Sequence, residues 1–371
     1  MRLYTTLLCF LFSFSLFSEE CCSQNYTLFC PEITPGYNAP LFQPCSSPRP
    51  YSFGSFLYLK ASQENMELGA KTLIEGAINV GASNFLILDL KQNAINLPFR
   101  FHPGYQVGVG LLFANDHWDL KASFTQYNVK NHVQVSTGAP SFILPSRAPF
   151  STAFLSSLIT LDLYEFAKES WDLEMYLLDL ELSREGYFGK NLSLKMGAGL
   201  RGALIDQSLS ATYLFANPAQ LSSFLDQSSH SLGVGPQCSF DLSWMIRNYF
   251  RIFATAEADV LHTWYPKLKY QTISSGTVFN DGDFETIEND FKQNDFSILR
   301  PHLEYSLGIG LKSPFLPNKG FFDLQLSYTF HVFFNQNMFR YFEDSLISAL
   351  STSPNGNLYV EGLVVRGQLN F

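Results

Sequence analysis

The chain has 371 residues and a formal net charge of −9; 16% of its residues are aromatic and only 15% are charged. Ordinary soluble domains have about 25% charged residues, so much of this surface must be apolar, and the acidic balance without a basic run excludes a nucleic-acid-binding surface. No run of about 18 apolar residues follows the N-terminus, so helical membrane spans are excluded there and the apolar excess must alternate along strands.

The N-terminus has the pattern of a secretory signal peptide. Met1 and Arg2 precede an apolar stretch over residues 3–17, and the polar residues 18–20 end it. A basic start, a short apolar core and a polar stop are typical of such a signal. We therefore expect residues 1–18 to be a cleaved signal; a single-pass anchor is the alternative, although the apolar core is short for a span.

Residues 19–52 are rich in cysteine and proline and have no sustained hydrophobic period, which predicts a periplasmic segment. Its cysteines are Cys21, Cys22, Cys30 and Cys45. Export to an oxidising compartment favours disulfides, within the chain or between chains. A metal site is disfavoured because no histidine is near and two of the cysteines are adjacent. We expect Cys238, alone in a later segment, to be a small apolar residue.

From residue 53 to the end, the sequence breaks into segments that alternate apolar and polar residues. The expected strands are Phe53–Ser62, Tyr105–Phe113, Trp118–Gln126, Trp171–Leu182, Leu192–Leu204, Leu232–Trp244, Phe250–Val260, Leu303–Leu311, Phe321–Asn335 and Leu358–Phe371. Most reach or exceed the 9 to 11 residues of a tilted membrane strand. Residues 53–371 are therefore predicted to form an all-β, antiparallel transmembrane β-barrel of about 10 strands, within a range of roughly 10 to 12.

The connections alternate between short and long. Short ones fall at 114–117, 184–191, 247–248 and 314–320, and long ones near 63–98, 129–170, 206–228, 265–298 and 336–357. This asymmetry is typical of outer-membrane barrels, whose periplasmic turns are short and whose extracellular loops are long. Three points stay open: Phe85–Leu90 could add a hairpin, Phe154–Lys168 has a helical pattern and would fold into the lumen or over the mouth, and the alternation slips near Tyr176 as at a bulge.

Aromatic residues mark the ends of several strands. They are Tyr105, Trp118, Trp171, Trp244, Tyr249 and Phe371. Amphipathic rings at strand ends settle at the lipid interface, with an ordinary core position as the alternative. The final Phe371 closes an alternating strand, a pattern that resembles the assembly signal read by the barrel-assembly machinery.

Three stretches carry a family resemblance: HPGYQVGVGLLFANDHWDLKASFTQY at 102–127, LKMGAGLRGALIDQ at 194–207, and SLGVGPQCSFDLSWMIRNYFRIFATAEADVLHTW at 231–264. Together they resemble the family of the Legionella major outer membrane protein and its relatives in chlamydia-like bacteria. Leu204 stands where that family usually has an aromatic, which keeps the lipid-facing character. The resemblance implies a porin-like outer-membrane protein exposed to host cells, and it supplies no catalytic residues.

Paired glycines lie on the inward face of four strands, at 108 and 110, 197 and 199, 233 and 235, and 308 and 310. Glycine weakens a strand and removes a side chain, so such pairs need a reason. One reason is a widened lumen. The other is room for a plug, such as residues 140–168 folded inside.

Charged residues also fall on inward positions. The candidate lumen-lining residues are Lys121, Lys195, Arg201, Glu257, Asp259, Glu304, Asp323, His331 and Arg366, with Asp119, Asp172, Glu174 and Arg251 as further inward charges. Around water they would set ion preference; in a closed barrel they would form salt bridges. Both signs are present, so no strong ion selectivity is predicted.

We expect a porin-like barrel for passive diffusion of small hydrophilic solutes or ions, with no enzyme activity and no cofactor. The alternative is a plugged structural or adhesive barrel that meets host cells through its long loops and its Phe-rich segment 338–342. A hydrolase is the third class, with His262 beside Asp259 or Glu257, or His302 beside Glu304. Expected partners are outer-membrane lipid, the assembly machinery, other envelope proteins through disulfides, and a second copy in a homo-oligomer, whereas nucleic acid is not expected.

Overall fold

The computed structural model describes residues 48–80, 85–113, 118–147, 164–188, 191–214, 221–246, 249–277, 284–316, 320–342, 351–352 and 355–371. Within these ranges no helix is long and apolar enough to cross a membrane.

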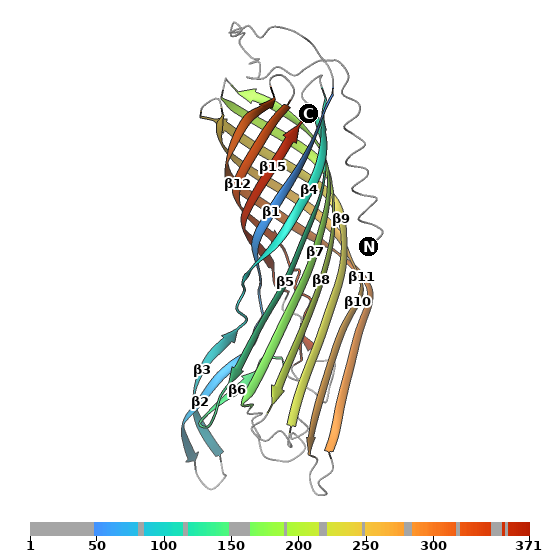
Figure 1. Cartoon of the computed structure of the whole chain (residues 1–371). Helices are drawn as coiled ribbons and strands as arrows, with labels where there is room; N and C mark the ends of the chain where they lie inside the picture. The colour runs from blue at the N-terminus through green and yellow to red at the C-terminus, as the bar shows by residue number, and fades with distance from the viewer. Residues whose placement is uncertain are drawn as a thin grey trace, which may run out of the picture.

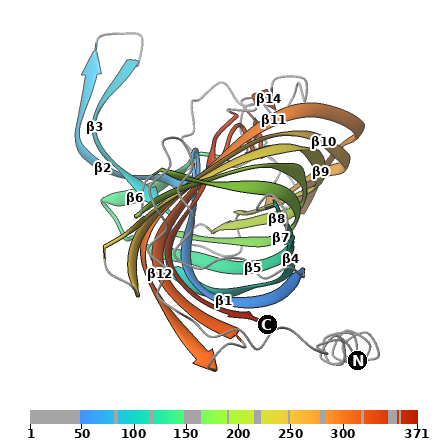
Figure 2. The same ribbon diagram turned by 90° about the horizontal axis from the view of Figure 1, so that it is seen from above.

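Ten antiparallel strands close into one barrel, with the spatial order β1-β15-β12-β11-β10-β9-β8-β7-β5-β4 and back to β1 (Figures 1 and 2). They are β1 (Arg49–Gln63), β4 (Phe101–Leu112), β5 (Trp118–Ser136), β7 (Phe166–Phe188), β8 (Leu192–Leu214), β9 (Leu221–Met245), β10 (Phe250–Thr277), β11 (Phe284–Leu316), β12 (Gly320–Phe333) and β15 (Leu358–Asn370). The expected fold class and all ten expected strands are confirmed. β1 begins at Arg49, ahead of the expected start at Phe53.

The connections divide the barrel into a short-turn end and a long-loop end. β4–β5, β7–β8, β9–β10 and β11–β12 are joined at the short-turn end, where β15 also ends and β1 begins (Figure 1). Near this end the outer surface is a band of exposed apolar side chains, such as Leu324, Leu326 and Tyr328 on β12. The alternate residues Asp323, Ser327 and Thr329 are buried inside.

Further along the strands, the two faces of the wall exchange polarity. On β7, Leu178 and Leu180 point outward while Asp179 is buried inside; closer to the long-loop end, Leu173 is buried inside and Glu174 is exposed. Pairing of β7 with β5 and β8 is continuous throughout. The bulge expected near Tyr176 is therefore wrong, because the sequence changes which face is apolar without changing the pleat.

Several strands also run beyond the apolar band. β8 to β11 continue through much of the expected long loops at 206–228 and 265–298 (Figure 1). Here several outward residues are polar, as at Ser208 and Asp226, although Phe224 is also exposed. The inward residues include apolar and aromatic ones, as at Leu209 and Tyr270, beside buried polar ones such as Gln227. The outward-apolar pattern ends where the strands leave the band, so that pattern stopped the predicted strands too early.

A small sheet lies beside this extension. Its strands are β2 (Glu67–Val80), β3 (Phe85–Asn96) and β6 (Ser141–Pro145), in the order β3-β2-β6. Leu68 and Ile143 from this sheet pack with Tyr164, Tyr213 and Leu225 in one buried cluster. The hairpin suggested by Phe85–Leu90 exists, but outside the barrel.

The helical pattern expected at 154–168 is wrong in part and in part lies outside the described residues. Within the helical pattern expected at 154–168, residues 166–168 are the start of strand β7, and residues 154–163 lie outside the described residues. Along the chain, β12 and β15 are separated by a two-stranded sheet of β13 (Tyr341–Phe342) and β14 (Ser351–Thr352).

Candidate functional site in the barrel lumen

The structure places the nine candidate charged residues on the inner face of the barrel, as alternation implies. They come from six strands: Lys121 on β5, Lys195 and Arg201 on β8, Glu257 and Asp259 on β10, Glu304 on β11, Asp323 and His331 on β12, and Arg366 on β15. Asp172 and Glu174, by contrast, point outward, because the inner face of β7 is apolar at that height.

Arg201 is the centre of the luminal charge network. Its guanidinium lies 2.6 Å from Asp179 Oδ1, 2.7 Å from Glu257 Oε2 and 2.9 Å from Asp259 Oδ2. Glu304 Oε2 lies 3.4 Å from the same group. These partners stand on β7, β10 and β11, so one buried side chain from β8 ties together four strands of the wall.

Further ion pairs lie in the lumen between Arg201 and the short-turn end. Lys121 contacts Glu181 at 2.6 Å, Arg251 contacts Asp323 at 2.5 Å, and Lys195 contacts Asp119. The Tyr51 hydroxyl donates a hydrogen bond to Asp119 over 2.9 Å. We call these residues, together with Arg201 and its four carboxylate partners, the charged layer.

Two members of the charged layer were missed by the sequence reasoning. Asp179 and Glu181 follow the assumed bulge on β7 and were therefore not counted as inward. Reading the strand with one uninterrupted pleat would have found both, since they alternate with the outward Leu178, Leu180 and Leu182.

The inward glycines accommodate side chains from adjacent strands. A Cβ atom at Gly108 would collide with the Phe53 ring, and one at Gly110 would collide with the Tyr51 ring. At Gly310 the same atom would meet Arg251 Nε at 2.8 Å. Neither explanation offered above holds at these three positions: the missing side chains leave space that neighbouring side chains fill.

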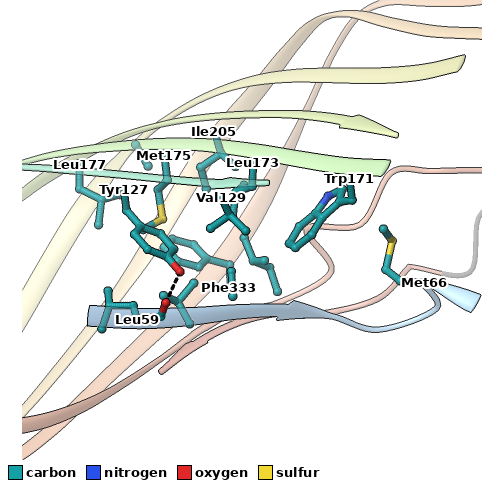
Figure 3. Close-up of a cluster of buried hydrophobic side chains, with 14 of the residues drawn as sticks. Leu59, Met66, Tyr127, Val129, Trp171, Leu173, Met175, Leu177, Ile205 and Phe333 are labelled. Atoms are coloured by element: carbon teal, nitrogen blue, oxygen red, sulfur yellow. Dashed lines mark hydrogen bonds between the residues drawn. The ribbon is translucent and has the colours of Figure 1, made fainter. Parts of the chain in front are cut away.

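Figure 3 shows part of a buried apolar layer. It lies on the long-loop side of the charged layer, since on β7 Leu173 and Leu177 precede Asp179 on the same face. It contains Leu57, Leu59, Ala61, Met66, Leu97, Tyr127, Val129, Trp171, Leu173, Met175, Leu177, Ala203, Ile205, Leu209, Leu261, Phe333, Phe339, Leu358 and Val360, all buried. They come from β1, β5, β7, β8, β10, β12 and β15, with Met66, Leu97 and Phe339 from the connections between strands, and they form one buried cluster. The Tyr127 hydroxyl donates to the Leu59 carbonyl oxygen at 2.6 Å and fixes one side of the layer.

The segment after β12 turns inward and covers this layer. Asn337 and Phe339 are buried, the Asn337 side chain donates to the Glu64 carbonyl at 2.7 Å, and the Tyr270 hydroxyl donates to the Met338 carbonyl at 2.7 Å. We call residues 334–340 the inward segment. The Phe-rich stretch 338–342, expected to be adhesive, thus places Phe339 in the interior.

The two candidate catalytic pairs have different outcomes. His262 is exposed on the outer face of β10, whereas Asp259 is buried on the inner face and Glu257 faces the same lumen, so the first pair is separated by the wall. His302 lies inside, 2.7 Å from Asp259 and close to Glu304.

The aromatic residues expected at the lipid interface lie on the outer face, with one exception. Tyr105, Trp118, Trp244, Tyr249 and Phe371 are exposed on the outside, but Trp171 is fully buried in the apolar layer and donates to Gln207. Cys238 is exposed on the outer face and forms no disulfide within the described part of the chain. Cys21, Cys22, Cys30 and Cys45 lie outside the described residues, and their disulfides stay predictions, as does the assembly role of Phe371.

Residues 43–371 match the family model of the Legionella pneumophila major outer membrane protein precursor. The chain belongs to this family. It is therefore an outer-membrane β-barrel protein, and by the usual orientation of such barrels its short-turn end faces the periplasm.

This outer-membrane protein has no match among curated proteins. Its fold is similar to the outer membrane protease OmpT from Escherichia coli, with 7% identity over 87% of this chain and 96% of that chain and a TM-score of 0.34. It is also similar to a Pseudomonas aeruginosa FadL homologue, with 9% identity over 88% of this chain and 90% of that chain and a TM-score of 0.27. The Pseudomonas putida toluene transporter TodX has 6% identity over 87% of this chain and 89% of that chain, with a TM-score of 0.27.

Proposed function

We propose that this protein is a closed surface barrel that holds its extended long-loop end outside the cell, without enzymatic chemistry. The observation that carries the proposal is the apolar layer. An ion that crossed it would lose its hydration shell among side chains that offer few replacement ligands, and burying an unpaired charge is very costly. The charged layer adds a second obstacle because its groups already bind one another.

The long-loop end supports the surface role. β7 to β11 continue beyond the apolar band, and the small sheet packs beside them. Binding residues are often found on loops that a rigid scaffold positions. We therefore propose this end as the part that meets other envelope proteins or host cells.

Conductance in planar bilayers tests whether the barrel is closed. We expect the folded protein to show no discrete conductance steps, and we expect Leu177→Gly, which thins the apolar layer, to introduce ion leakage. Leu178→Gly is the matched control, because the neighbouring leucine is 61% exposed on the lipid side whereas Leu177 is 3% exposed. Stable discrete steps from the unmodified, folded protein would overturn the closed barrel.

Passive diffusion of small hydrophilic solutes or ions is the second candidate. It is favoured by the solvent contact of charged groups on the short-turn side of the apolar layer. There the Lys195 side chain is 26% exposed and that of Glu304 is 19% exposed. If the barrel conducts, charge reversal at Lys195 and Arg366 to glutamate should move the reversal potential toward cation preference. An unchanged potential would remove both residues from the conducting wall.

A further inference from the structure

Three potential metal ligands meet in the charged layer. His302 and Glu304 are two residues apart on β11 and face the lumen, and His331 on β12 is paired directly with Glu304. One ligand atom from each of the three residues lies within 4.8 Å of the other two. The grouping follows from strand geometry, because alternate residues share a face and directly paired residues are neighbours.

The hydrogen bonds of His302 leave one nitrogen available. Its Nδ1 lies 2.7 Å from Asp259 Oδ2, and an ionised carboxylate only accepts, so Nδ1 carries the proton and donates. Arg201 Nη1, which can only donate, lies 2.9 Å from this Nδ1 and 2.9 Å from Asp259 Oδ2. We assign its hydrogen bond to the Asp259 carboxylate, because the shorter 2.7 Å contact gives the Nδ1 proton to the same oxygen. The other ring nitrogen, Nε2, then presents a lone pair; it is buried and has no hydrogen-bond partner in the described part of the chain.

Histidines that bind metals usually donate their second ring nitrogen to a carboxylate, which fixes the tautomer and the ring orientation. Asp259 stands in that position behind His302. The imidazole ring also stacks on Phe333 at a centroid distance of 4.0 Å, which restrains it further. His302 is therefore held with its free nitrogen available for a ligand.

The local charge favours a cation. Asp179, Glu257, Asp259 and Glu304 all contact the single positive charge of Arg201. Glu257 and Glu304 are also directly paired across β10 and β11, an arrangement that is unfavourable for like charges. Lys121 is a second cation near Glu257 and Glu304, but it already pairs with Glu181 at 2.6 Å. A divalent ion beside Glu304 would therefore reduce the remaining excess of negative charge.

We propose that His302, Glu304 and His331 bind a divalent transition-metal ion of the Zn²⁺ class inside the lumen, with Asp259 as the positioning residue. Two imidazole nitrogens favour such ions over Mg²⁺ or Ca²⁺, which prefer oxygen. Ligands of Zn²⁺ lie about 3.3 Å apart when each bond is about 2.0–2.1 Å, so small side-chain rotations would close the site. The inference goes beyond the proposed function, which requires no metal.

Metal titration of the purified, folded, full-length protein tests this proposal. After removal of metals with a chelator, Zn²⁺ binding is measured by competition with a chromophoric chelator, and Co²⁺ absorption reports the donor atoms. We expect one Zn²⁺ per chain, at least tenfold weaker binding in His302→Gln and His331→Gln, and a loss of about 10- to 100-fold in Asp259→Asn.

Two controls separate the site from other metal-binding groups. His262→Gln changes an exposed histidine on the outer face and should bind Zn²⁺ like the unmodified protein. A variant with serine at Cys21, Cys22, Cys30, Cys45 and Cys238 should also keep its affinity, and its Co²⁺ spectrum should show nitrogen and oxygen donors. This second variant keeps the test valid even if the histidine variants fail to fold.

Three results would overturn the metal site. They are the absence of Zn²⁺ binding to the folded protein, unchanged affinity in folded His302→Gln and His331→Gln, and loss of binding in the serine variant. None of these results depends on conductance, so the metal site and the closed barrel can fail separately.

Discussion

Arg201 provides one positive charge to four carboxylates in a part of the lumen that water barely reaches, its side chain being 2% exposed. Removing one partner of a buried ion pair leaves uncompensated charge, which costs far more than the net contribution of the intact pair. The identity of this single residue therefore matters more to the charged layer than that of any exposed lysine.

Arg201→Met should lower the free energy of unfolding by about 3–5 kcal/mol, because four carboxylates lose their shared cation. Urea unfolding in detergent micelles measures the change, with the fraction of folded barrel read from its mobility on a gel. Lys130→Met is the control, since the exposed Lys130 and Asp172 are 3.6 Å apart at the outer surface and such pairs contribute about 0–1 kcal/mol. Equal effects of the two substitutions would contradict a central role for Arg201.

Gly108→Ala should destabilise the barrel by about 1–3 kcal/mol through overpacking, because its Cβ would displace the Phe53 ring. Gly54→Ala is the matched control on β1, where a Cβ would meet nothing within 4 Å. Thermal unfolding of both variants gives the comparison. A neutral Gly108→Ala would mean that the lumen has room to spare.

Glu169 is a buried carboxyl in the part of β7 beyond the apolar band, 3.9 Å from Arg147. Burial raises the pKa of Glu169 from 4.5 to about 7, against the opposing effect of Arg147. A folded-state pKa above the unfolded one means that this group's stabilising contribution is complete below about pH 4.5 and is lost as the pH rises to about 7.

Glu169→Gln should therefore flatten the dependence of unfolding free energy on pH by up to about 3 kcal/mol between these limits. Denaturant unfolding at a series of pH values measures it, with the exposed Glu174→Gln as control. A pH profile that Glu169→Gln leaves unchanged would show that the carboxyl titrates normally.

At the scale of elements, the inward segment depends on a few polar contacts. Asn337 donates to the Glu64 carbonyl at 2.7 Å and accepts from the Phe339 amide at 2.9 Å. Losing such buried partners costs about 1–3 kcal/mol for each polar group left unsatisfied. Removal of the Asn337 side chain alone should therefore loosen the packing of residues 334–340.

Asn337→Ala should release the inward segment and speed its cleavage in limited proteolysis while the barrel stays folded. Asn128→Ala, at an exposed position on β5, should cleave at the rate of the unmodified protein. If Asn337→Ala is equally resistant, contacts such as the pairing of Gln227 with Arg340 hold the segment without it.

At the scale of the whole molecule, the two ends of the barrel should differ in accessibility. An epitope inserted between Thr277 and Phe284, at the long-loop end, should be labelled on intact cells. An epitope inserted between Met245 and Phe250, at the short-turn end, should be labelled only after the outer membrane is permeabilised. The reverse pattern would invert the orientation and remove the basis for a surface role.

The amino-acid sequence by itself determined the barrel, its ten strands and, except on β7, the side of the wall on which the charged residues fall. Each depends on local alternation, as in β12, where Leu324 and Leu326 face out while Asp323 faces in. Strand length and the order of short and long connections then predicted closure and orientation.

Only the tertiary structure decided what fills the lumen. Arg201 meets partners up to 103 residues away, and Tyr51 lies across Gly110 from a neighbouring strand. Such contacts depend on strand register and barrel closure, which alternation does not encode. The same holds for β7, where the faces exchange polarity: the sequence showed that the pattern changed at Tyr176, but only the neighbouring strands showed that the pleat continued.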